Sequence, residues 1–142
     1  MLKIVICCGA RMSSSFLAQR LQNEVVSRGL EEVYSVSFYP LEMTGVENAK
    51  ENLEQYDVAM CCPHLKIEVN KIARLFPDLD CALYIMPPKM YGTLIFDEVI
   101  KDAQDVYEGY KESHMIPFHF PNEDNPLKVK RSKAYYNLYK NK

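Results

Sequence analysis

The residues best suited to chemistry lie near the N-terminus, where a cysteine is followed by small residues and then by three serines. The stretch reads Cys8-Gly9-Ala10-Arg11-Met12-Ser13-Ser14-Ser15. If a helix starts here, its first turn has N–H groups without internal partners and a dipole that favours an anion. Gly9 and Ala10 allow the backbone to approach a phosphoryl group closely, and the serine hydroxyls add donors. The pattern therefore predicts a P-loop-like phosphate-binding loop, with Cys8 as a thiolate nucleophile of lowered pKa.

A purely structural interpretation of the same residues stays open. A buried cysteine behaves as a small hydrophobic residue, and a serine cluster can serve only as a helix cap. Cys7, which points to the other side of its strand, is predicted to belong to the core. Cys61 and Cys81 are predicted to be core residues for the same reason, since free cysteine is among the most buried residue types.

Composition limits the classes of protein to which the chain can belong. It has 142 residues, 48% of them hydrophobic, which is enough for one domain with a core. With no long apolar run and no signal peptide pattern, we expect a cytoplasmic protein. Five cysteines in that reducing setting favour thiols over a disulfide framework. No Cys-x-x-Cys spacing occurs, so we expect no metal and no cofactor.

Strand and helix signals alternate four times along the chain. Apolar or alternating runs predict strands over 2–8, 33–39, 57–62 and 81–86, and helical spacing predicts helices over 13–28, 48–55, 65–76 and 96–110. This order indicates an α/β fold, a three-layer sandwich with a four-stranded parallel sheet in the order 2-1-3-4, flavodoxin-like or Rossmann-like. Ligands bind such sheets where the strand order reverses, which places the site after Cys8 and Cys62.

The elements that surround Cys8 give the chain a family resemblance. The loop from Cys8 to Ser15 resembles the active-site loop of the enzyme IIB component of the sugar phosphotransferase system, lactose/cellobiose type. The run from Asp57 to Pro63 resembles that family's third strand and its Gly-Pro-Gln turn, and Tyr91-Gly92 resembles a Tyr-Gly pair after the fourth strand. The similarity extends through most of residues 1–108, with the elements in the same order.

The resemblance implies an activity and partners. By it, the Cys8 thiolate would take a phosphoryl group from the phosphohistidine of a IIA protein and pass it to a sugar held by the IIC membrane permease. The chain would then be a cytoplasmic phosphotransferase subunit that associates with the membrane through IIC. Positioning and electrostatics would supply most of the catalysis. The positions that correspond to the rest of the site are Cys62, Pro63, His64 and Tyr91.

Three residues depart from the family pattern. Arg11 stands where the family usually has Gly, and it either pairs with phosphoryl oxygens or points outward and alters partner docking. His64 either lines the site or caps a helix and faces solvent. Cys62, at the end of a neighbouring strand, could reach Cys8 and form a redox-sensitive disulfide, which requires a short Cα separation.

The C-terminal part differs in charge from the rest. Residues 1–110 hold ten basic and sixteen acidic residues, net −6, whereas residues 111–142 hold seven and three, net +4. We therefore divide the chain into a IIB-like domain, 1–110, and a basic extension, 111–142. Segment 113–121 is suited to extended packing across the domain, and a short helix could follow Leu127. The extension is a solvated arm, an arm docked on the acidic body, or a partner-binding or membrane-surface segment. Nucleic-acid binding is its least expected use, and the acidic body gives that interpretation no support.

Two other functions compete with the transport subunit. A regulatory module of the same fold could be phosphorylated on Cys8 to report sugar supply to another protein, and the extension and Arg11 keep this alternative open. A low-molecular-weight phosphatase would need Cys, five residues, then Arg, together with an Asp acid. That position is Ser14, and the chain has no Asp-Pro pair. The phosphatase interpretation is therefore disfavoured.

Overall fold

Four parallel strands form the centre of the molecule. The computed structural model describes the backbone of residues 1–8, 12–41 and 45–139, and the side chains of these residues except 8 and 12–15. The strands are β1 (Leu2–Cys8), β2 (Tyr34–Pro40), β3 (Val58–Cys61) and β4 (Ala82–Ile85). They form one sheet in the order β2-β1-β3-β4, with every pairing parallel, as the alternating sequence pattern predicted.

The strands form where the sequence has continuous apolar runs or, in β2, an alternating pattern. Every residue of β3 and β4 is buried, which is typical of parallel strands covered on both faces. β2 lies at an edge of the sheet and is only partly buried. In the centre, Ile4 of β1 pairs with Val58 of β3, and the register continues to the pair Cys7 and Cys61.

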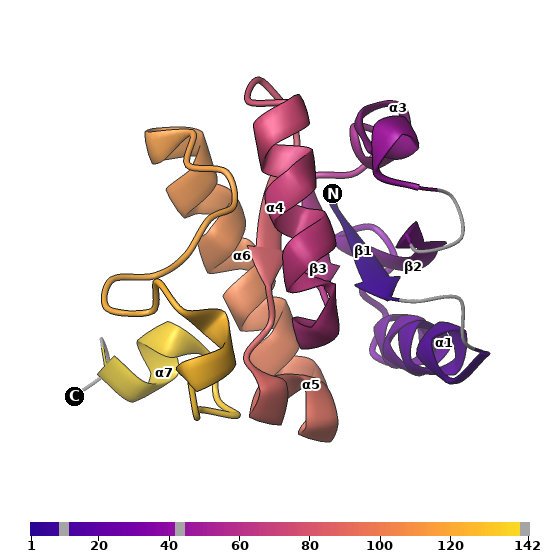
Figure 1. The fold of residues 1–142 in the computed structure, drawn as a ribbon. Helices are drawn as coiled ribbons and strands as arrows, with labels where there is room; N and C mark the ends of the chain where they lie inside the picture. The colour runs from indigo at the N-terminus through magenta and orange to yellow at the C-terminus, as the bar shows by residue number, and fades with distance from the viewer. Residues whose placement is uncertain (9–11, 42–44, 140–142) are drawn as a thin grey trace.

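Helices connect the strands and cover the sheet. They are α1 (Met12–Ser27), α3 (Ala49–Leu53), α4 (Lys66–Leu75), α5 (Pro88–Thr93) and α6 (Phe96–Ser113), with 3-10 turns η1 (Val46–Asn48) and η2 (Pro63–Leu65). Figure 1 shows α4 in front of β3 and α6 behind it. An ion pair between Arg28 and Asp97, at 2.8 Å, joins the C-terminal end of α1 to the start of α6. The layers are those of the predicted sandwich.

Helix α5 is an element of the described body that the sequence did not predict. The Pro87-Pro88 pair follows the apolar run of β4. In the structure Pro88 is the first residue of α5. Proline suits this position because its fixed φ matches the helix and its missing N–H would have no intrahelical partner.

The chain beyond α6 returns to the sheet and packs along β4. The Phe118 N–H donates to the Leu83 carbonyl at 2.7 Å, and Phe118 forms a parallel bridge with Tyr84. The predicted packing of segment 113–121 across the domain is confirmed at Phe118, whereas Ser113 ends α6 and His114 has a left-handed backbone. Because an uncovered edge strand can pair with another chain, this segment also protects β4.

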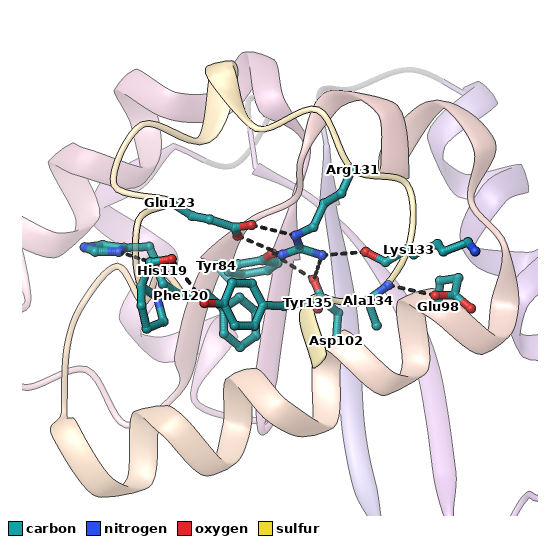
Figure 2. Close-up of polar contacts among 11 residues, drawn as sticks. Tyr84, Glu98, Asp102, His119, Phe120, Glu123, Arg131, Lys133, Ala134 and Tyr135 are labelled. Carbon is teal, nitrogen blue, oxygen red and sulfur yellow. Dashed lines mark hydrogen bonds and ion pairs between the residues drawn. The ribbon is translucent and has the colours of Figure 1, made fainter. Parts of the chain in front are cut away.

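A buried polar cluster holds the rest of the tail in place (Figure 2). It consists of Tyr84, Asp102, Glu123 and Arg131, and we call it the Arg131 cluster. Arg131 donates from Nε and Nη2 to the two carboxylate oxygens of Glu123, at 2.7 and 2.8 Å. It also donates from Nη1 to Asp102 Oδ2, at 3.2 Å, and from Nη2 to the Tyr84 hydroxyl, at 2.8 Å. Arg131 therefore joins the tail to both β4 and α6.

Burial and charge act in opposite directions within the Arg131 cluster. Burial raises the pKa of the Asp102 carboxyl, and the Arg131 charge and the bond from the Tyr135 N–H counteract this rise. For Arg131, burial alone would lower the pKa, but its bonds to Glu123 and the neighbouring charges hold it above the ordinary value. The guanidinium therefore stays charged inside the protein.

Aromatic packing completes the attachment of the tail. Phe120 is buried and stacks on Tyr135, with ring centroids 4.5 Å apart and planes at 5°. It also meets Tyr84 edge to face at 5.9 Å. Tyr135 begins the short helix α7 (Tyr135–Tyr139). Of the three alternatives for the extension, the structure has the docked arm. The division at residue 110 stays a prediction, and α6 continues across it to Ser113.

Candidate functional site

The carboxyl ends of β1 and β3 meet at the predicted switch point. β1 ends at Cys8 and β3 at Cys61, and the two strands are neighbours in the sheet. The Cys62 N–H donates to the Cys7 carbonyl at 2.9 Å, which continues the register by one residue beyond β3. The chain then leaves β1 toward α1 and leaves β3 toward η2 and α4. The structure therefore places the backbone of Cys8 and Cys62 at the same edge of the sheet.

The short connection from β1 to α1 is the predicted phosphate-binding loop. Gly9, Ala10 and Arg11 lie outside the described residues, and so do the side chains of Cys8 and of Met12, Ser13, Ser14 and Ser15. Their predicted roles, and the P-loop-like conformation, stay predictions. The described backbone does show that α1 begins at Met12, close after Cys8, and continues for 16 residues. The start of such a helix favours an anion.

Three of the other cysteines are confirmed as core residues. Cys7, Cys61 and Cys81 are buried and carry free thiols. A hydrogen bond with Cys61, together with burial, raises the pKa of the Cys7 thiol well above its ordinary value. Burial likewise raises the pKa of Cys81. At neutral pH the Cys7 and Cys81 thiols are protonated, and they are therefore poor nucleophiles.

Cys62 differs from these three. It is fully buried, with 0% of its surface exposed, and it is disulfide-bonded. The general expectation of thiols throughout the chain is therefore wrong for this residue. Its backbone is extended, with φ −64° and ψ 148°, immediately before the 3-10 turn η2.

The other predicted site residues lie at the same edge but differ in exposure. Pro63 is partly buried as the first residue of η2, where proline suits a helix start. His64 is exposed, in line with the solvent-facing alternative. Tyr91 is partly buried on α5, the helix that follows β4. Both connections, like that of β1, begin at carboxyl ends of parallel strands.

Two hollows in the described part of the chain are lined by residues of the tail. An open hollow of about 710 Å³ is lined entirely by tail residues, including Asn125, Lys128 and Tyr139. A smaller hollow of about 130 Å³ lies between α4, the end of β4 and the tail, and Lys66, Pro87 and His119 contribute to its walls. Neither hollow is lined by a cysteine.

A comparison with known protein families shows the family to which this chain belongs. The family model described as "PTS system, Lactose/Cellobiose specific IIB subunit" matches residues 3–102. The chain belongs to this family. As a IIB protein it is a transferase component of the sugar phosphotransferase system, which takes part in sugar transport. IIB components act together with IIA and IIC components. The matched region runs from β1 into α6, so that the tail lies beyond it.

A solved structure supports the IIB fold. It is the solution structure of a cellobiose-specific phosphotransferase IIB component protein from Borrelia burgdorferi, with a TM-score of 0.57 and 20% sequence identity. The similarity covers 76% of this chain and 93% of that one. No protein among the curated sequences matches this chain at a significant level. Within its described residues, the IIB chain has no helix both long and apolar enough to cross a membrane.

Proposed function

We propose that Cys8 of this IIB protein accepts a phosphoryl group from the phosphohistidine of a IIA component and passes it to a sugar bound by a IIC permease. The observation that carries the proposal is the position of Cys8 as the last residue of the central strand β1, shortly before α1 begins at Met12. A thiol at such a point lies where a helix start can lower its pKa and hold an anion. Membership of the IIB family supports the same assignment.

The proposed reaction consists of two displacements at phosphorus. The Cys8 thiolate attacks the phosphoryl group, a P–S bond forms, and the P–N bond to the IIA histidine breaks. The imidazole leaves with the electron pair and takes up a proton. In the second step a sugar hydroxyl attacks the phosphocysteine, gives up its proton, and the P–S bond breaks to restore the thiolate. Both steps depend on orientation and on stabilisation of charge on the phosphoryl oxygens.

The residues after Cys8 would hold the phosphoryl group between the two steps. Gly9 and Ala10 would permit close approach of the backbone, and Ser13, Ser14 and Ser15 would donate hydrogen bonds or cap α1. Arg11 would add a cation suited to phosphate geometry. The protein would work at the cytoplasmic side of the membrane, where IIA and IIC meet it. Cys62, Pro63, His64 and Tyr91 would form the neighbouring wall.

A regulatory module phosphorylated on Cys8 is the second candidate function. It is favoured by the docked tail, which lies beyond the region matched by the family model and is fixed by the Arg131 cluster. Such a module would be phosphorylated by IIA and would not pass the group to a sugar. Formation of sugar phosphate in membrane vesicles that contain IIC distinguishes the two functions.

The decisive experiment is phosphoryl transfer in a reconstituted chain. The protein, kept reduced, is incubated with phosphoenolpyruvate, the general phosphotransferase proteins and candidate IIA proteins, and the phosphate is mapped by mass spectrometry. We expect a thiol-linked phosphate on Cys8, abolished in Cys8→Ser and retained in Cys81→Ala, which alters a buried cysteine far from this edge. Phosphate on another residue, or none with any IIA protein, would contradict the proposal.

A further inference from the structure

We propose that Cys62 is a resolving cysteine, a modification site at which the chain forms a reversible disulfide with Cys8. While this bond exists, Cys8 has no thiolate and cannot accept a phosphoryl group. The disulfide follows from the cysteines and the sheet alone. Its consequence for phosphoryl transfer rests on the proposed function of Cys8.

The identity of the partner follows from the other cysteines. Cys62 is disulfide-bonded, whereas Cys7, Cys61 and Cys81 are free thiols. The chain has five cysteines in all. Within the chain, Cys8 is therefore the one cysteine left to pair with Cys62.

The register of the sheet makes this pairing geometrically suitable. Cys7 of β1 and Cys61 of β3 are direct partners in neighbouring parallel strands, and the Cys62 N–H bonds to the Cys7 carbonyl. Neighbouring strands lie about 4.8 Å apart. The next residues along both strands are Cys8 and Cys62, so this spacing falls within the Cα separation of roughly 4.4–6.8 Å that a disulfide requires.

The pair one position earlier provides an internal comparison. Cys7 and Cys61 lie on the same two strands and are both buried, yet their thiols are free. A raised pKa keeps Cys7 protonated. Adjacency of two cysteines across this sheet is therefore not sufficient for a disulfide.

The chemistry is a two-electron oxidation by a peroxide. Cys62 has no exposed surface, so the oxidant must react first at Cys8. The Cys8 thiolate attacks one peroxide oxygen, the O–O bond breaks, and a sulfenic acid and hydroxide form. The Cys62 thiol then attacks the Cys8 sulfur, the S–O bond breaks, water leaves and the S–S bond forms. A dithiol reductant reverses the reaction by exchange.

The test compares the wild type with Cys62→Ala and with the matched control Cys61→Ala. The control removes a buried sulfur from the neighbouring residue, the last of β3. Each reduced protein is treated with hydrogen peroxide, alkylated and analysed by peptide fragmentation, before and after dithiothreitol. In the wild type and in Cys61→Ala we expect Cys8 and Cys62 to be protected from alkylation together, and the linked peptides to have lost two hydrogens. After dithiothreitol both cysteines should be alkylated fully again. In Cys62→Ala we expect Cys8 to proceed to sulfinic acid, which a dithiol does not reverse. If Cys62→Ala folds poorly, Cys62→Ser gives the same comparison.

The outcomes separate this inference from the proposed function. Reversible protection of Cys8 in Cys62→Ala equal to that of the wild type, or irreversible oxidation of Cys8 in the wild type, would overturn the resolving role. Phosphorylation by IIA is then measured on the same samples. We expect the phosphorylation rate of the oxidised wild type to fall at least about tenfold, and dithiothreitol to restore it. If the disulfide form were phosphorylated as fast as the fully reduced protein, the inference would also be overturned. Failure of the fully reduced protein to be phosphorylated would instead count against the proposed function, while the thiol mapping would still decide the disulfide.

Discussion

Arg131 shows how strongly the setting of a single residue determines its role. In the sequence it is one of six basic residues after Leu127, with no acidic residue among them. In the structure its side chain is 3% exposed, whereas its neighbour Lys130 is exposed. Arg131 has two carboxylate partners, Glu123 and Asp102. A buried charge with this many bonds is costly to disrupt because its partners would be left without compensation.

Arg131→Met is predicted to lower the free energy of unfolding by about 3–5 kcal/mol, since it leaves two buried carboxylates without their cation. The measurement is urea denaturation followed by circular dichroism. Lys130→Met is the matched control and should change stability little, because that side chain is exposed and has no ion pair within the described residues. Equal stability of both variants would show that the Arg131 cluster does not hold the tail.

At the scale of elements, the contact between α6 and the returning tail depends on a glycine. A Cβ atom at Gly109 of α6 would lie 2.5 Å from the ring of Phe118, far closer than atoms can approach. Phe118 cannot move freely because it is buried and packs edge to face on Phe120 at 5.2 Å. Gly92 of α5, by contrast, has nothing within 4 Å of such an atom. Identical substitutions in two helices should therefore have opposite effects.

Gly109→Ala is predicted to destabilise the protein by about 1–3 kcal/mol, because overpacking against Phe118 outweighs the gain in helix propensity. Gly92→Ala should be neutral or stabilise the protein by up to about 1 kcal/mol, since only the propensity changes. Thermal and urea unfolding of both variants measure the difference. A gain in stability for Gly109→Ala would mean that segment 116–120 does not pack closely on α6.

For the whole molecule, the main question is whether body and tail unfold together. The contacts that cross residue 110 involve the sheet, α6 and the tail: the Phe118 bond to Leu83, the Arg131 bond to Asp102, and the bond from the Tyr135 N–H to Asp102 at 2.9 Å. A tail that joins the core in this way belongs to the same cooperative unit as the sheet. The charge difference between the two parts then reflects a basic arm docked on an acidic body.

Native-state hydrogen exchange tests this cooperativity. We predict that the amides of Phe118 in the tail and Cys62 in the body exchange with the same free energy, close to the global value from denaturation. The Lys128 amide, which bonds only across a local turn to Asn125, should exchange much faster. A Phe118 amide that opens several kcal/mol below Cys62 would instead support two separate units.

The sequence alone determined the sheet, its strand order and its candidate nucleophile. Apolar runs of β-branched residues alternate with helical spacing, and the chirality of parallel crossovers leaves few ways to connect them. Cys8 could be found because the switch point of such a sheet follows from strand order. Only the tertiary structure decided the roles of Arg131, Gly109 and Cys62. These depend on contacts between residues far apart in the chain: which carboxylates a cation meets, how closely a ring approaches a helix, and which strand ends lie side by side. Local sequence patterns do not determine such distances, because tertiary packing sets them.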